Sequence, residues 1–152
     1  MSYALARPVL VAIVVAASTT TKVQGLGSAL VHDKTINERV FGESRHFGVL
    51  ATAGRQWGPA TLSANIRSYD VALLVDYPDS DDAAAIDAAI VADYEAISAA
   101  LSSSANWQTP ASTIRCLGAD SESANSQLFP FVVVDVEGGK RLRIQFPMEV
   151  SL

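Results

Sequence analysis

The sequence predicts an α+β fold, a two-layer sandwich in which a mainly antiparallel sheet of about five or six strands carries two helices on one face. Three observations support this prediction. Residues 141–150 alternate strictly between polar and apolar side chains, which is typical of a strand with one face on a core. Residues 83–102 repeat apolar side chains at spacings of three and four, which is typical of an amphipathic helix. The chain has 152 residues, so 1–152 are expected to form a single domain with its own core.

The N-terminal segment is expected to be a buried helix that starts near Ser2 or Tyr3. Its apolar stripe consists of Leu5, Val9, Ile13 (or Ala12) and Ala16. The apolar run after Arg7 also has the length of a signal-peptide core, and it is shorter than the ~20 apolar residues that a membrane span needs. A buried helix is therefore favoured, and no membrane partner is expected. The alternative is an exported cell-envelope domain whose signal is residues 1–18.

Three strands are expected between this helix and the middle of the chain, at 29–31, 47–53 and 65–76. The third is apolar on both faces, which favours a central position in the sheet. The polar segment 35–43 is expected to be a loop or one helical turn, and 54–59 a loop that follows the second strand.

The acidic stretch 79–82 is expected to open the second helix, because carboxylates are favourable at a helix N-terminus and Asp79 or Ser80 can cap it. The apolar stripe of this helix consists of Ile86, Ile90, Tyr94, Ile97 and Leu101. Asp93 falls at the edge of the stripe and weakens the pattern.

The chain is expected to close with a hairpin. A short strand at 113–117 and an exposed loop at 118–127 precede it. The hairpin turns at Gly138-Gly139, and the nearly continuous apolar run 131–136 predicts that its first strand is the more central one. The inward face of the last strand consists of Leu142, Ile144, Phe146, Met148 and Val150. Pro147 cannot donate to a ladder, so the far end of this strand is expected at a sheet edge or bulge.

Charge is unevenly distributed along the chain. Residues 1–75 carry seven Lys or Arg against four Asp or Glu, whereas residues 76–152 carry four against twelve. The acidic second half argues against a dedicated, sequence-specific nucleic-acid binder, which usually shows a basic patch. Opposite charge in the two halves suits contacts between neighbouring subunits.

No catalytic, cofactor-binding or metal-binding constellation is predicted. His32 and Asp33 are adjacent, and adjacent residues on a strand point to opposite faces. His46 and Cys116 lack the spacing of a zinc site or the local signature of a nucleophile. The alternative of a small ligand-binding or hydrolase domain that uses His32, Asp33 or Cys116 is kept open.

The stretch 45–57 is the candidate interface with a neighbouring subunit or partner. It combines Arg45, Phe47, Arg55 and Trp57 with glycines that loosen the backbone. Arg and Trp are enriched among the residues that carry binding energy at protein interfaces. The alternative is that one large ring only tucks this loop onto its own domain.

The order of elements carries a resemblance to a known family. The N-terminal helix leads through LGSALVHDK and INERVFGES to the arginine-bearing stretch RHFGVLATAGRQW. An arginine strand (IRSYDVALLVDYPD), an alanine-rich helix (AAAIDAAIVADYEAISAAL) and a final hairpin (PFVVVDV with RLRIQFPMEV) complete the order. Over most of its length the chain resembles the tail terminator proteins of long-tailed bacteriophages.

This resemblance implies a structural protein of the virion neck and tail, assembled in the host cytoplasm, with no enzyme activity and no cofactor. Such proteins form a homo-oligomeric, hexameric ring at the top of the tail tube. The ring ends tube polymerisation and joins the tail to the head. The expected partners are therefore further copies of this chain, the tail tube protein and the head–tail connector protein.

Overall fold

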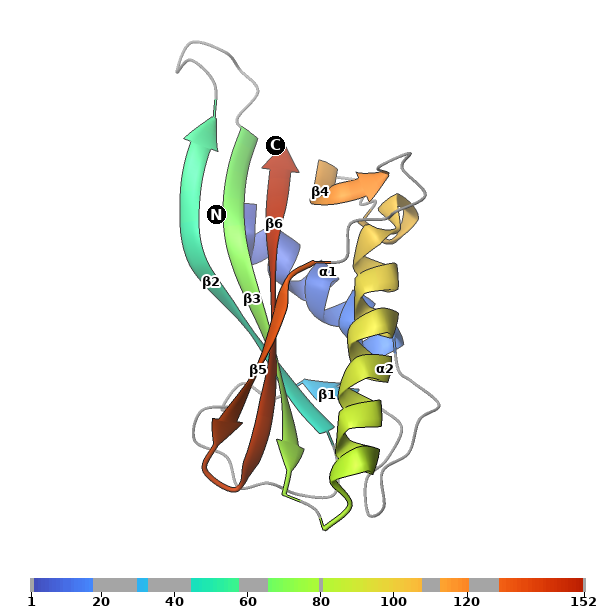
Figure 1. Cartoon of the computed structure of the whole chain (residues 1–152). Helices are drawn as coiled ribbons and strands as arrows, with labels where there is room; N and C mark the ends of the chain where they lie inside the picture. The colour runs from blue at the N-terminus through green and yellow to red at the C-terminus, as the bar shows by residue number, and fades with distance from the viewer. Residues whose placement is uncertain are drawn as a thin grey trace.

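The computed structural model describes residues 2–17, 30–32, 45–57, 66–79, 81–107, 113–120 and 129–151. In chain order the elements are α1 (Ser2–Ala16), β1 (Leu30–His32), β2 (Arg45–Trp57), β3 (Ile66–Pro78), α2 (Ala83–Ser102), the short 3-10 helix η1 (Ser104–Trp107), β4 (Thr113–Asp120), β5 (Phe131–Val136) and β6 (Gly139–Ser151). Figure 1 shows a strongly twisted sheet with α2 along one side. Two α-helices and a six-stranded sheet in this part of the chain confirm the α+β prediction.

The strands form one sheet in the order β1–β2–β3–β6–β4, and β5 also pairs with β6. β1 runs parallel to β2, and the other pairings are antiparallel. The central pair of β3 and β6 continues from Ile66 opposite Ser151 to Pro78 opposite Gly139. β4 and β5 pair with the two ends of the remaining edge of β6. The expected strand at 65–76 is thus confirmed as a central one.

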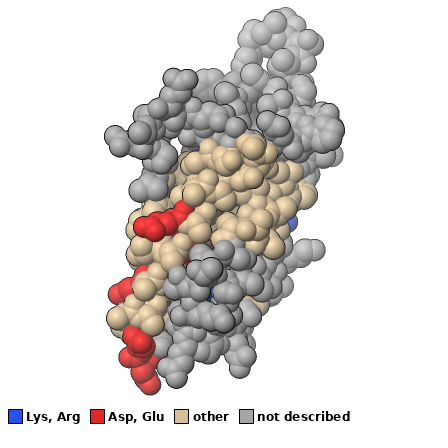
Figure 2. Space-filling view, turned by 90° about the vertical axis from the view of Figure 1, so that its right-hand side faces the viewer, with Lys and Arg blue, Asp and Glu red and all other residues tan. Residues whose placement is uncertain are grey.

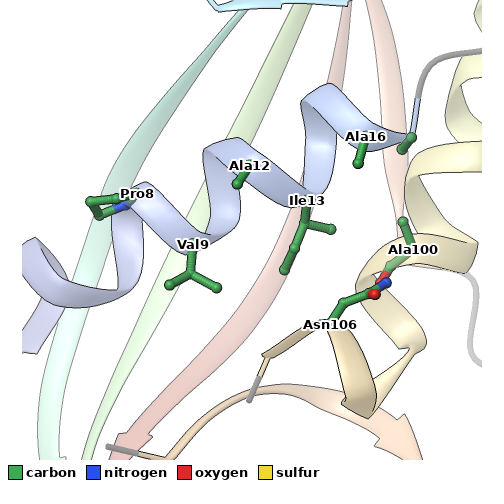
Figure 3. A pocket seen from close by; sticks show the side chains of 8 residues that line it. Pro8, Val9, Ala12, Ile13, Ala16, Ala100 and Asn106 are labelled. Carbon is green, nitrogen blue, oxygen red and sulfur yellow. The ribbon is translucent and has the colours of Figure 1, made fainter. Parts of the chain in front are cut away.

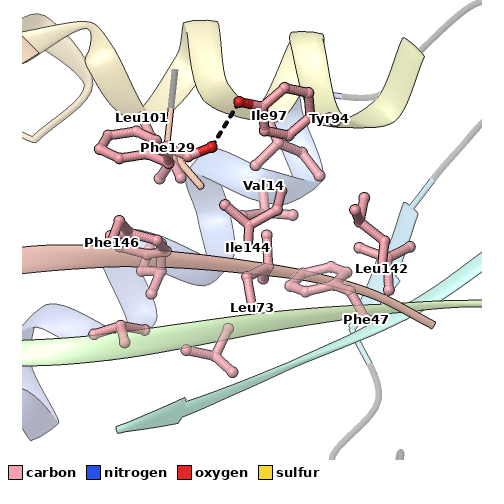
Figure 4. Packing of buried hydrophobic residues seen from close by; sticks show 14 of the residues in the cluster. Val14, Phe47, Leu73, Tyr94, Ile97, Leu101, Phe129, Leu142, Ile144 and Phe146 are labelled. Carbon is pink, nitrogen blue, oxygen red and sulfur yellow. Dashed lines mark hydrogen bonds between the residues drawn. The ribbon is translucent and has the colours of Figure 1, made fainter. Parts of the chain in front are cut away.

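The core lies between the sheet and the helices (Figure 4). The sheet contributes Phe47, Val71, Leu73, Val75, Leu142, Ile144, Phe146 and Met148, and the helices contribute Leu10, Val14, Ile90, Ile97 and Leu101. Every second residue of β6 from Leu142 to Met148 is buried in this cluster. The alternation of the terminal strand therefore identifies its inward face correctly.

α2 is fixed by local contacts as well as by the core. α2 begins at Ala83, and its N-cap is Asp82, whose side chain accepts a hydrogen bond from the Ala85 N–H at 3.0 Å. The cap is thus not Asp79 or Ser80, because the helix starts later than expected. The Tyr94 hydroxyl donates to the Phe129 carbonyl at 2.6 Å and connects α2 to the chain before β5 (Figure 4). Among the described helices, none is both long and apolar enough to span a membrane.

β2 is longer than the sequence suggests. It runs to Trp57, and its residues from Gly54 onward pair with β3, so the prediction of a loop from Gly54 is wrong for this segment. A register shift between Ala51 and Ala53 marks a bulge, where the Thr52 hydroxyl donates to the Asp70 carbonyl at 3.1 Å. Cross-strand pairing overrides the weak strand propensity of glycine here. The expected loop at 35–43 lies outside the described residues.

The apolar run in β5 is at the surface, which corrects the prediction of a central strand. The exposed fractions of its first four side chains are 42% for Phe131, 57% for Val132, 39% for Val133 and 41% for Val134. β6 already has β3 on its other side, so β5 is outermost, and no other strand in the described ranges pairs with it. The run 131–136, which is apolar on both faces, is therefore an exposed edge strand of this sheet and not a central one.

The closing hairpin turns at Glu137 and Gly138, one residue earlier than the expected Gly138-Gly139, because Gly139 already pairs with Val136 as the first residue of β6. Gly138 has a φ of 83°, which glycine adopts without steric cost. Gly139 pairs with Pro78, and a Cβ atom at Gly139 would collide with the backbone carbonyl oxygen of Tyr77. The turn is also held by the Asp79 N–H, which donates to the Gly138 carbonyl at 2.9 Å.

Pro147 lies inside the sheet and not at an edge or bulge of β6. The Gln145 N–H donates to the Pro130 carbonyl, away from β3, so Pro147, two residues later, also directs its nitrogen away from β3. On that side, β5 pairs only as far as Ile144 and β4 begins only at Met148. The missing N–H therefore falls in the gap between two partner strands, where it breaks no ladder hydrogen bond.

The strand expected at 113–117 is present as β4 and runs on to Asp120. The first part of the loop expected at 118–127 is therefore strand. The remainder, from 121 to 127, lies outside the described residues.

Candidate functional site

Arg45 and Phe47, two of the four candidate interface residues, are inside the fold. Both side chains are fully buried, so neither is available to a partner, and the interface prediction is corrected for these two. Phe47 faces the core, opposite Val75 of β3. Arg55 and Trp57 belong to β2 by their backbone, but their side chains lie outside the described part of the structure. Their partner contact stays a prediction.

Arg45 is part of a buried polar cluster with Asp93 and Tyr77. Its Nη1 lies 2.8 Å from the Asp93 Oδ1 in an ion pair between β2 and α2. The Tyr77 hydroxyl donates to the other carboxylate oxygen of Asp93 at 2.6 Å. Burial, and then the negative charge of Asp93, raise the pKa of Tyr77 well above its ordinary value of 10.0. Tyr77 therefore stays a neutral hydrogen-bond donor at physiological pH.

This buried cluster connects the helix to the sheet and does not form a reaction site. All three side chains are fully buried, so a substrate in solution does not reach them. A buried ion pair is stable only when its charges are paired and hydrogen-bonded, and Asp93 accepts from both partners. The sequence signal was the position of Asp93 at the edge of the apolar stripe of α2, where a carboxylate requires a buried partner.

A second charged pair lies on the face of the sheet that points away from the helices. Arg141 donates to both carboxylate oxygens of Asp76, at 2.6 Å through Nε and at 3.1 Å through Nη2. Asp76 is buried, and His46 lies opposite it on β2. The short, two-pronged contact fixes the positions of β3 and β6 relative to each other. On this face of the sheet, Arg141 and Arg143 are half-buried.

The residues considered for catalysis are not brought together. His32 belongs to β1 and Cys116 to β4, at opposite ends of the strand order. Four strand spacings separate them, which is roughly 19 Å at the usual distance between neighbouring strands. A nucleophile and its base need hydrogen-bond contact, so these two backbone positions do not form such a pair. Asp33 lies outside the described residues.

The described part of the chain contains an open apolar cavity but no cluster of metal ligands. No three His, Cys, Asp or Glu side chains there gather as metal ligands. An open apolar cavity of about 610 Å³ lies between α1 and the end of α2 (Figure 3). Its one polar lining side chain, Asn106, donates to the Ala100 carbonyl at 2.9 Å. The amide N–H of this lining residue is therefore engaged with its own chain.

The most unusual surface of the described structure is the edge of the sheet at β5. Four consecutive large apolar residues, Phe131 to Val134, are each at least 39% exposed. Phe131 also packs against Tyr94 of α2, with 4.2 Å between ring centroids. A row of unpaired backbone groups flanked by apolar side chains is a template for pairing with another strand. This edge is therefore the candidate site, and its geometry suits pairing with another protein strand.

The chain matches no known protein-family model and no curated protein sequence. The candidate site is therefore described by its geometry alone, as an exposed apolar edge strand on an α+β sandwich. The buried Arg45–Asp93–Tyr77 cluster lies between the sheet and α2 and is closed to solvent.

Proposed function

We propose that this protein is a structural subunit of a bacteriophage neck. In this proposal its copies form a ring, expected to be hexameric, that caps the tail tube and joins the tail to the head connector. The proposal combines the resemblance in element order to tail terminator proteins with a surface suited to assembly. It involves no enzyme activity, cofactor or metal.

The observation that carries this proposal is the exposed apolar edge of β5. Monomeric proteins protect such edges with lysines, prolines or bulges, because open strands otherwise aggregate. Phe131 to Val134 contain none of these devices. An edge of this kind is stabilised when another protein chain covers its apolar surface in an assembly.

The enzyme alternative has weaker support. The backbone positions of His32 and Cys116 lie too far apart in the sheet for a shared reaction, and the Arg45–Asp93–Tyr77 cluster is closed to solvent. Charge also argues against sequence-specific binding of nucleic acid. On the side of the molecule covered by α2, Figure 2 shows acidic side chains and hardly any Lys or Arg among the described residues.

Deletion of the gene from the phage that carries it tests the proposal. The expected phenotype is full heads that lack joined tails, with tail tubes of uncontrolled length, and rescue by the gene supplied in trans. Mass spectrometry of purified wild-type virions should detect the protein. Normal particles from the deletion strain, or virions without the protein, would contradict the proposed function.

A triple variant distinguishes the enzyme alternative from the proposed structural function. His32→Gln, His46→Gln and Cys116→Ala together remove the side chains that could carry proton transfer or nucleophilic attack. The triple variant should rescue particle assembly whenever its thermal melt shows a folded protein. A folded triple variant that fails to rescue would favour the enzyme alternative.

A further inference from the structure

The free edge of β5 presents an ordered row of backbone hydrogen-bonding groups. The Gln145 N–H donates to the Pro130 carbonyl, which shows that residue 130 directs its carbonyl toward β6. Successive residues of a strand direct their backbone groups to alternate sides. The N–H and C=O groups of Phe131, Val133 and Asp135 therefore point to the free edge, away from β6.

The opposite side of the sheet offers a second open edge, on β2. β1 pairs only with Arg45–Phe47, so β2 has no partner in the described ranges on that side from Gly48 onward. Leu50 is 44% exposed and Ala51 to Gly54 are exposed as well, whereas Gly48 and Val49 are buried. No charged residue occurs between His46 and Arg55. The exposed segment Leu50–Gly54 is about as long as β5 and, like Phe131–Val134, has no charged side chain.

The two edges are complementary in direction. β2 is antiparallel to β3, β3 to β6, and β6 to β5, so β2 and β5 run in opposite directions. If an identical sheet is placed beside β5, the next strand is the neighbour's β2, and it continues the antiparallel alternation. A single head-to-tail contact therefore covers both open edges of every copy. A two-fold contact between two β5 strands covers one edge and leaves β2 open.

The faces of the two strands also match. Val132 lies opposite Arg143, Arg143 opposite Leu74, and Leu74 opposite Gly48, so this row lies on one face of the sheet. By alternation, Val134 and Leu50 point to the same face as Val132. In a continued sheet, Leu50 of one copy comes opposite Val132 or Val134 of its neighbour, which gives an apolar cross-strand pair.

We infer that β5 of one copy pairs in antiparallel fashion with the exposed Leu50–Gly54 segment of β2 in the next copy, so that the sheet continues across the subunit boundary. This heterologous contact uses two different edges of the same chain, and its repetition closes a ring when the rotation between copies divides a full turn. The inference depends on the proposed function for two points only: that the copies close into a ring, and that this ring lies in the phage neck. The contact itself is testable with the purified chain.

Disulfide trapping between two differently labelled proteins tests the contact. All variants carry Cys116→Ala, and one of them adds Leu50→Cys while the others add Val132→Cys or Val134→Cys. Leu50 and its valine partner are a non-hydrogen-bonded pair across the new boundary, where Cβ atoms are close enough for a disulfide. Oxidation of a concentrated mixture traps even a transient contact. The expected result is a covalent dimer when Leu50→Cys is mixed with one of the two valine variants.

The controls make each outcome decisive. Val91→Cys places a thiol on α2 at a valine that is 47% exposed, similar to those of β5, and it should give no dimer with Leu50→Cys. A dimer from Val132→Cys or Val134→Cys alone would overturn the head-to-tail contact in favour of a two-fold one. The head-to-tail contact would also be overturned if thermal melts show that all variants are folded and neither mixture gives a dimer. If the protein is detected in virions but the variants do not cross-link, only this contact is overturned. If the variants cross-link but the protein is absent from virions, only the proposed function is overturned.

Discussion

Replacement of Asp93 by asparagine should strongly destabilise the fold. The substitution keeps the shape of the side chain but removes the negative charge that lies 2.8 Å from the Arg45 guanidinium. Arg45 is fully buried and would then hold an uncompensated charge. Breaking a buried ion pair in this way costs about 3–5 kcal/mol, a large share of the ~5–15 kcal/mol that stabilises a typical domain.

Urea titration at neutral pH measures this loss directly, and a thermal melt should show a decrease in Tm of roughly 6–20 °C for a domain of this size. The matched control is Asp87→Asn on the same helix. The Asp87 side chain is 69% exposed and lies 4.0 Å from Lys140, so its loss should cost less than about 1 kcal/mol. If Asp93→Asn were as stable as Asp87→Asn, the buried cluster would not connect α2 to the sheet.

A double variant refines this prediction. Arg45→Met combined with Asp93→Leu removes both charges together and leaves no unpaired ion in the core. Apolar replacement of a whole buried pair is often neutral or stabilising. The double variant should therefore be more stable than Asp93→Asn. If the double variant loses at least as much stability as Asp93→Asn, packing around these side chains, and not the charge, determines the loss of stability.

Three further perturbations test other parts of the fold. Tyr77→Phe removes a donor to a carboxylate and should cost about 1.5–3 kcal/mol in urea titrations. Because the pKa of Tyr77 is raised in the folded state, the stability that Tyr77 contributes should be fully present well below pH 10.0 and be lost as the pH rises above it, where the phenol of the unfolded chain ionises. The free energy of unfolding should therefore decrease less for Tyr77→Phe than for the wild type at alkaline pH, and an identical decrease would argue against the raised pKa. Gly139→Ala should destabilise by about 1–3 kcal/mol, because its Cβ meets a backbone oxygen that has little room to move, and an unchanged melt would contradict that contact. Ile144→Asp buries a charge in the core and should give insoluble protein on expression; soluble protein with a cooperative melt would show that this face of β6 is not core.

The sequence predicts the elements whose side chains report directly on burial. In β6, the polar and apolar residues alternate because one face meets the core and the other does not, so Leu142, Ile144 and Phe146 are assigned correctly. The same logic identifies α2, where Ile90 and Ile97 face inward. Periodicity is a local signal, and here local structure and tertiary packing agree.

The failures occur where a residue's environment depends on distant parts of the chain. The apolar run of β5 fits a buried strand equally well, and only the sheet order places it at an edge. Arg45 has the composition of a surface anchor, yet α2 provides its partner Asp93 from 48 positions further along the chain. The sequence does not specify which strand is outermost or which carboxylate meets which guanidinium, so the candidate site becomes visible only with the fold.

A cryo-EM reconstruction of the phage neck would show whether this chain forms the proposed ring. We expect a sixfold ring of this chain at the top of the tail tube, between tube and connector, in which the sheet of each copy continues into the next through β5 and β2. A neck reconstruction whose density is fully explained by other proteins would contradict the assignment.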